Sequence, residues 1–174
     1  MVANPVLKPK LATPALVLTS VAIAVCFVCL VWSAAANGPD NLFLLLTAAK
    51  ALLGGAAAGA VWSVRARRRR SWMAGANARW DHLNDMKRSS GATAELTVVS
   101  VDALEPTGSW ITIKWNRFDH VQPAWMEALP EPIWAGATLL ISPDPAQVRP
   151  GAPWPETYYI RASDSLAWAP GREA

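Results

Sequence analysis

The chain has 174 residues, 52% hydrophobic and 17% charged, which leaves room for one small domain beside apolar segments. Its net charge of +3 is unevenly divided: residues 1–90 carry 11 Lys and Arg against 3 Asp and Glu, and residues 91–174 carry 5 against 10. The acidic second half argues against nucleic-acid binding, which needs a positive field. Cys26 and Cys29 both lie in the first apolar run, so no disulfide framework or thiolate zinc site is available elsewhere.

An uncharged apolar segment covers residues 11–32, after a tail at 1–10 that carries Lys8 and Lys10. About 20 helical residues, rising about 1.5 Å each, cross a hydrocarbon core of roughly 30 Å. The segment is therefore predicted to be a transmembrane helix. A secretory signal cleaved after Ala36 is the alternative, but the apolar stretch is longer than such signals require, which favours a retained anchor.

A second apolar segment covers residues 42–64, after a short loop at 33–41 that lacks Lys and Arg. Five arginines follow it directly: Arg65, Arg67, Arg68, Arg69 and Arg70. Because cytoplasmic flanks are enriched in Lys and Arg, we expect a helical hairpin with an external loop and both termini in the cytoplasm. The chain is thus predicted to be a multi-pass integral protein of the cell inner membrane.

The second apolar segment holds a charge and a run of small residues. Lys50 lies about 12 Å along the helix from Leu42, a depth that costs roughly 2.5–3.5 kcal/mol. It either snorkels or pairs with an acidic group of a partner. Small residues allow close helix packing. The predicted helix-packing residues are Lys50, Gly54, Gly55 and Gly59, and their partner is the first span, another membrane protein or a second copy.

Residues 65–90 are predicted to form a polybasic amphipathic juxtamembrane helix, since Trp72, Ala76, Trp80 and Leu83 recur at helical spacing. Aromatic and basic residues suit anionic headgroups, although the helix can equally dock under the following domain. The predicted membrane-surface residues are Arg65, Arg67, Arg68, Arg69, Arg70, Trp72 and Trp80. His82 lies between two aspartates, which favours a solvated face over a metal site.

From residue 91 to 170 the pattern changes to a period of two. Strands are predicted over 95–101, 110–115, 120–125, 137–141, 157–161 and 166–168, with breaks at the turn 105–108, at 130–132 and at the proline-rich loop 143–155. Residues 171–174 form a tail. The expected fold class is a membrane-anchored α+β protein with a small antiparallel β-barrel or sandwich of the OB- or SH3-like kind.

No catalytic, metal or cofactor constellation stands out, so the chain is expected to be non-enzymatic and cofactor-free. We expect an accessory or scaffold subunit that contacts lipids and presents its cytoplasmic β domain to a partner. The alternative is a membrane-tethered binding module for a small ligand, lipid headgroup or nucleic acid. Its possible ligand face is Trp110, Lys114, Arg117 and Phe118, where aromatic and basic residues interleave, together with the loop 143–155.

The predicted arrangement, two spans followed by a small cytoplasmic β-barrel, resembles that of the short membrane partners of stomatin-type scaffold proteins. The resemblance is one of architecture, and no residue role is transferred from it.

Overall fold

The computed structural model describes residues 4–37, 42–127, 134–149 and 151–171. The chain forms two compact units. The helical hairpin spans Pro9–Trp72, and the β domain joins Met1–Lys8 to Met73–Ala174. Five predicted segments lie wholly or partly outside the described residues: the tail at 1–10, the loop at 33–41, the break at 130–132, the loop at 143–155 and the tail at 171–174. Within the predicted loop at 33–41, residues 33–37 are helical, because the first helix continues past its apolar part.

Two helices account for the first half of the chain. Helix α1 is Pro14–Asn37 and begins at a proline, which is tolerated where no intrahelical N–H bond is needed. Helix α2 is Leu42–Ser89, 48 residues without interruption, so the arginine run continues the helix instead of ending it. Both helices are long and apolar enough to cross a membrane: an 18-residue window has a mean hydropathy of 2.7 within Pro14–Ala36 and of 1.4 within Leu45–Ser89.

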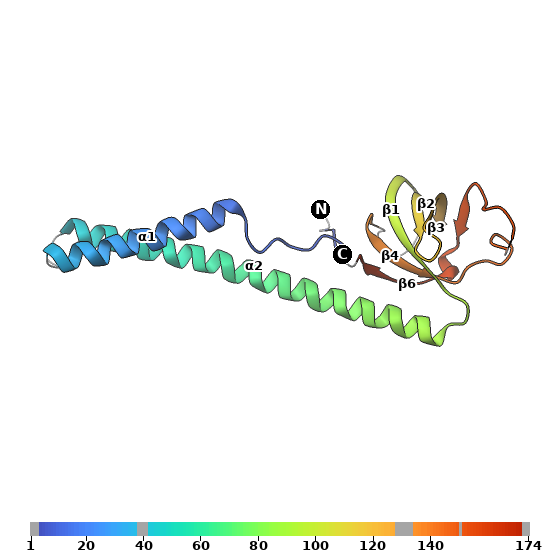
Figure 1. The fold of residues 1–174 in the computed structure, drawn as a ribbon, viewed down its shortest axis with the longest axis horizontal. Coiled ribbons are helices and arrows are strands. Elements are labelled where there is room, and N and C mark those ends of the chain that lie inside the picture. Colours follow the sequence, from blue (N-terminus) through green and yellow to red (C-terminus); the bar gives the residue numbers. More distant parts are fainter. Residues whose placement is uncertain (1–3, 38–41, 128–133, 150, 172–174) are drawn as a thin grey trace. The chain divides into compact units, whose positions relative to one another are not determined.

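Within the hairpin, α1 lies beside the first part of α2 and runs in the opposite direction (Figure 1). Trp62 Nε1 donates a hydrogen bond of 3.1 Å to Ser20 Oγ. The Arg65 guanidinium donates one of 3.2 Å to Thr13 Oγ1. Later residues of α2 thus meet earlier residues of α1, as an antiparallel pair requires.

The β domain is built on one curled six-stranded sheet (Figure 1). The strands are β1 (Ala94–Glu105), β2 (Gly108–Trp115), β3 (His120–Glu127), β4 (Ala137–Ile141), β5 (Tyr158–Ile160) and β6 (Ser165–Pro170), with a 3-10 helix, η1 (Ala162–Asp164), before β6. Their order is β5-β3-β2-β1-β4-β6. The predicted turn at 105–108 is present, since Glu105 pairs with Gly108 across the β1–β2 hairpin.

The expectation of an entirely antiparallel sheet is wrong at one edge, where β5 runs parallel to β3. The proline-rich loop after β4 explains the difference, because prolines prevent a tight hairpin return and a parallel pair needs a long connection. The sheet also keeps two edges, β5 and β6. This mixed topology does not support the expected OB- or SH3-like assignment.

The sheet is buried on both faces at β4, whose five residues are all buried. One face carries the main core, formed by Leu96, Val98, Ile111, Ile113, Trp115, Ala124, Met126, Ala137, Leu139, Ile141, Tyr158 and Ile160. On the other face, Leu83 of α2 is fully buried against Leu140, Ala167 and Ala169. The end of α2 is therefore an integral part of the β domain, the second of the two placements that its amphipathic pattern allowed.

The start of the chain also packs on this domain. Residues 4–7 form a turn in which Val6 N donates 2.9 Å to Asn4 Oδ1 and Leu7 N donates 3.3 Å to the Asn4 carbonyl. Val6 packs against the main core. A Cβ at Gly136, whose φ is +84°, would lie 3.2 Å from a methyl of Val6. Residues 4–8 are thus a docked segment of the β domain.

Candidate functional site

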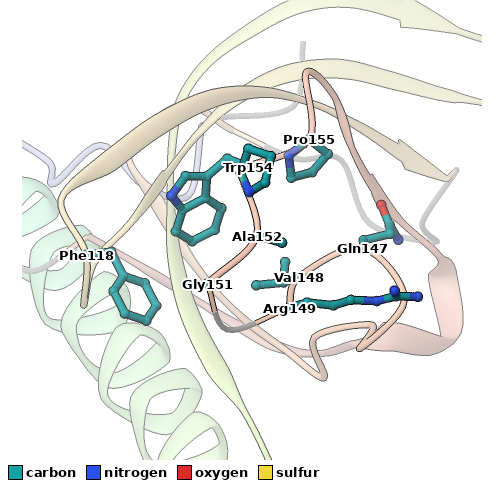
Figure 2. A pocket seen from close by; sticks show the side chains of 9 residues that line it. Phe118, Gln147, Val148, Arg149, Gly151, Ala152, Trp154 and Pro155 are labelled. Atoms are coloured by element: carbon teal, nitrogen blue, oxygen red, sulfur yellow. The ribbon is translucent and has the colours of Figure 1, made fainter.

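A pocket of about 380 Å³ lies between the loop that joins β4 to β5 and the turn after β2. We call it the Trp154 pocket. Its described lining residues are Phe118, Gln147, Val148, Arg149, Gly151, Ala152, Pro153, Trp154 and Pro155 (Figure 2). Phe118 comes from the β2–β3 turn and the other eight come from the loop, so the pocket exists only where the loop folds back on the sheet.

Aromatic contacts fix the wall of the pocket. The Trp154 ring stacks on His120, with centroids 4.5 Å apart and planes at 19°. It also meets the buried Trp115 at 5.2 Å and Phe118 at 5.6 Å. Phe118 nevertheless remains 57% exposed. The pocket thus offers one anchored indole and one accessible phenyl ring, both of which favour apolar or aromatic ligands.

The side chain of Gln147 holds the loop by forming two hydrogen bonds with the backbone of β5, as a neighbouring strand would. Gln147 Nε2 donates 3.0 Å to the Tyr159 carbonyl, and Tyr159 N donates 2.7 Å to Gln147 Oε1. These bonds satisfy backbone groups of the edge strand β5, which would otherwise offer a template for pairing. The Gln147 amide is therefore occupied by the fold and is not available to a ligand.

Asp144 holds the other end of the loop. Its carboxylate accepts hydrogen bonds from Ala146 N at 2.8 Å and from Gln147 Nε2 at 3.3 Å, and it lies 3.5 Å from the Arg161 guanidinium. The Ala146 amide, then Gln147, holds the pKa of this carboxyl below its usual 3.8. Asp144 N donates 3.0 Å to the Tyr158 hydroxyl, whose pKa is raised by burial.

Gln122 of β3 also ties the loop to the sheet. With its amide oriented to satisfy both of its neighbours, Gln122 donates 3.1 Å to the Pro155 carbonyl and accepts 2.9 Å from Trp115 Nε1. Gln122 is 4% exposed, so both bonds are shielded from water. The Trp154 pocket is consequently formed before any ligand arrives, which lowers the entropic cost of binding.

The charge near the pocket comes from two guanidinium groups. Arg149 lines the pocket, is exposed, and has no ion pair among the described residues. The Arg117 guanidinium lies 5.7 Å from the centre of the Phe118 ring. Aromatic walls beside a free guanidinium suit a ligand that combines an apolar body with an anionic end.

The two histidines, His82 and His120, differ in their surroundings. The His120 ring is stacked under Trp154. Over the described ranges, no group of three His, Cys, Asp or Glu side chains is placed to hold a metal ion. His82 and its neighbouring aspartates are exposed on α2.

The structure divides the predicted ligand face. Trp110 lies on the exposed face at the start of β2, where its ring meets Trp125 at 5.0 Å and its Nε1 donates 3.1 Å to Glu105. Phe118 lies beyond the other end of β2, eight residues away. At about 3.3 Å per strand residue, Trp110 is separated from Lys114 by roughly 13 Å. Trp110 therefore does not line the Trp154 pocket.

Lys114 is also engaged elsewhere, in a salt bridge with Asp119. The hydrogen bond and the charge of Lys114 hold the pKa of the Asp119 carboxyl below its usual value. Arg117 and Phe118 are the two predicted residues that the structure brings together. Sequence reasoning named the loop 143–155 but none of its side chains. A tryptophan between two prolines in a long loop was the available signal.

A second pocket, of about 550 Å³, lies between the end of α2 and the sheet. Its described lining residues are Trp80, Asn84, Lys87, Glu95, Thr97, Asn116, Gly136, Thr138 and Gly171. Its polar groups largely satisfy one another, since Lys87 Nζ lies 2.5 Å from Glu95 and Thr97 Oγ1 donates 2.7 Å to Asn116. This pairing makes it a weaker candidate for ligand binding than the Trp154 pocket.

The predicted helix-packing residues do not share one face. Gly54 faces Ile23 and Gly55 faces Ile23 and Phe27, with Cβ positions 3.6–3.8 Å from those side chains. A Cβ at Gly59 would meet nothing within 4 Å. Lys50 is exposed. Two glycines thus lie at the α1–α2 contact, whereas Gly59 and Lys50 lie outside it.

The predicted membrane-surface residues fall into both units. Arg65 donates a hydrogen bond to Thr13, the residue before α1. Arg67, Arg68 and Arg70 are exposed, while Arg69 and Trp72 are partly buried. Trp80 belongs to the β domain instead, where its Nε1 donates 3.0 Å to the Pro170 carbonyl. The arginine run and Trp72 therefore lie in the hairpin unit, and Trp80 is a packing residue of the sheet.

Comparison of the chain with protein-family models, with curated proteins and with solved structures finds no match.

Proposed function

We propose that this chain is an integral membrane protein whose two helices span the bilayer and whose β domain serves as a non-enzymatic accessory module for a partner. One observation carries the membrane assignment: the hairpin exposes large apolar side chains along its length. They include Val17, Leu18, Val21, Val25, Val28, Val31, Trp32, Leu45, Leu46, Leu52, Leu53, Val61 and Val64. Exposed apolar surface on this scale suits lipid and not water.

Packing at the N-terminus supports an even number of crossings. Val6 precedes α1 in the chain and packs on the core of the β domain, which follows the hairpin. Two crossings return the chain to the side on which it began, and one crossing would leave Val6 across the membrane from its contacts. The same contact supports a retained α1 over a signal segment that is removed.

The arginine run supports the orientation. Arg65 and the exposed arginines after it follow the apolar part of α2, and Lys8 and Lys10 precede α1. Basic flanks at both outer ends of the hairpin favour cytoplasmic termini. Lipid contact by these groups is worth about 1 kcal/mol per cation at an anionic surface.

Alkaline extraction and reporter fusions test the placement. The full chain should stay in the membrane pellet at high pH. A fluorescent protein fused after Ala174 should be fluorescent, and alkaline phosphatase at the same position should be inactive. Deleting residues 42–64 should reverse both reporters, because it removes one crossing. Release at high pH, or an active phosphatase on the full chain, contradicts the proposal.

The accessory role rests on the state of the polar groups in the β domain. Gln147 and Asp144 are occupied in holding the loop, and His120 is stacked under Trp154. Such a domain is suited to binding. The full chain, purified in a mild detergent from native membranes, should co-elute with a partner in stoichiometric amount. Elution as a lone monomer from several detergents contradicts the role.

The Trp154 pocket favours a second candidate, a membrane-tethered module that binds an apolar carboxylate. In nanodiscs, the full chain should bind naphthoate more strongly than its neutral alcohol in saturation-transfer NMR. Phe118→Ala and Arg149→Gln should each weaken binding at least several-fold. Trp110→Phe, at the far end of β2, is the matched control and should leave it unchanged. Equal signals for the acid and the alcohol contradict this candidate.

A further inference from the structure

The surface of α2 that lies outside the α1 contact carries one charge within its apolar part, Lys50. Ala51 of α2 is buried, and Gly54 and Gly55 contact α1. Lys50 is exposed and makes no hydrogen bond or ion pair with any described residue. The α1–α2 contact therefore leaves this ammonium group without compensation.

The depth of Lys50 argues against snorkelling as its resting arrangement. The midpoint of the apolar stretch 42–64 is residue 53, and Lys50 is three residues, about 4.5 Å, from it. Half of a hydrocarbon core of roughly 30 Å is about 15 Å. A lysine side chain in a helix points toward the helix N-terminus on a four-carbon stem, which brings the ammonium group of Lys50 closer to the external interface. The ammonium group still does not reach that interface.

A charged group within a membrane span pairs with an opposite charge or with backbone carbonyls, and the opposite charge for an ammonium group is a carboxylate. Residues 11–32 and 42–64 contain no Asp or Glu, so neither α1 nor the matching segment of a second copy can supply one at this depth. The residues around Lys50 on its side of α2 are exposed and apolar: Leu46, Leu53, Ala57 and Val61. We call this set, with Lys50, the Lys50 face.

We infer that the Lys50 face is the binding surface for a transmembrane helix of a different membrane protein, which carries an Asp or Glu at the depth of Lys50. The inference rests on the proposed function, since it requires the hairpin to span the membrane. Two opposite charges in hydrocarbon form a charge-assisted hydrogen bond, and the pairing removes the cost of leaving either charge alone. Partner choice would then be set within the membrane, separately from any contact of the β domain.

Adjacent leucines provide a matched pair of probe positions. Leu53 lies on the Lys50 face and is 73% exposed, and Leu52 is 61% exposed but about 100° around the helix at nearly the same depth. A photoreactive amino acid at Leu53, in the full chain in native membranes, should form a crosslink to another protein. The same amino acid at Leu52 should form that crosslink at least five-fold less.

The charge is then varied while the probe stays at Leu53. Lys50→Met should abolish the crosslink, and Lys50→Arg should retain it. Mass spectrometry should identify a protein with an Asp or Glu within a transmembrane segment. Lys50→Asp should lose the crosslink and regain it when that acidic residue of the captured protein is replaced by Lys. If swapping the two charges restores the crosslink, the two residues pair directly, because a protein that is only adjacent would not respond to the swap.

Several results would overturn the inference. They are a crosslink of two copies of this chain, a crosslink that survives Lys50→Met, a captured segment without a carboxylate, and the absence of a crosslink at Leu53. Alkaline extraction of each variant separates these failures from a failure of the proposed function. A Lys50→Met chain that stays in the membrane pellet leaves the two-span assignment standing while the partner assignment falls.

Discussion

Replacing Leu83 with alanine tests whether the end of α2 belongs to the β domain. Leu83 is 0% exposed and packs against Leu140, Ala167 and Ala169. Truncating a fully buried leucine costs 2–5 kcal/mol, so about 3 kcal/mol is expected. A domain of about 100 residues loses roughly 4–8 °C per kcal/mol, so its Tm should fall by about 12–24 °C. Alanine also has the higher helix propensity, so a loss cannot come from the helix itself.

The assay is thermal unfolding of the full chain in nanodiscs, followed by near-ultraviolet circular dichroism of the domain's aromatic groups. His82→Ala is the matched control, because His82 is the exposed neighbour of Leu83 on the same helix. It should change stability by no more than about 0.5 kcal/mol. Equal melting of the two variants would refute the packing of α2 on β4 and β6.

Three further predictions concern the sheet and its loop. Gly108→Ala should cost about 1–3 kcal/mol in urea unfolding, because a Cβ there would lie 2.5 Å from a carbonyl oxygen and a tryptophan ring, whereas Gly91→Ala, with open space, should be neutral. Gln147→Leu should cost about 1–3 kcal/mol and speed hydrogen exchange at the Tyr159 amide; unchanged exchange would contradict the strand-capping role. Because the folded pKa of Asp144 is lowered, its contribution is present above pH 3.8 and is lost as pH falls through the folded pKa, so Asp144→Asn should flatten the acid limb of stability against pH.

Local patterns predicted most of the element positions. The period of two predicted a strand over 110–115, and the alternating residues Ile111, Ile113 and Trp115 of β2 are all buried. The length of the apolar segments predicted both helices, because the backbone hydrogen bonds of a helix are made within the segment itself and not with distant partners. Periodicity was thus sufficient wherever the determining interaction is between near neighbours in sequence.

Long-range pairing could not be predicted in the same way. The parallel β3–β5 pair depends on where a long proline-rich loop returns, and the strand pattern of Tyr158–Ile160 is the same for either direction. The burial of the tryptophans depends on distant contacts in the same way: among the described residues, Trp115 is the one tryptophan in the buried core, and Trp154 and Trp168 pack against it. Composition counts large side chains but does not show that Trp110 remains exposed while Trp154 packs against the core.

In the candidate site, too, the part formed by residues close together in sequence was predicted, and the part formed by distant residues was not. Interleaved aromatic and basic residues marked Phe118 and Arg117, which follow one strand. The rest of the Trp154 pocket comes from a segment about 30 residues later in the chain, and Gln147 is fixed there by the backbone of Tyr159. A glutamine that completes a strand edge has no sequence pattern of its own, because its partner is a backbone group that every residue carries.

Charge and packing support the proposed topology through different physics. Because cytoplasmic flanks are enriched in basic residues, the arginine run indicates on which side of the membrane the β domain lies. The contact of Val6 with the core is an apolar contact buried on folding, and it indicates only that the number of crossings is even. An external β domain with Val6 still docked would therefore reverse the orientation and keep the hairpin. A single crossing would require Val6 to leave the core, and the stability of the domain would then no longer respond to a polar substitution at that position.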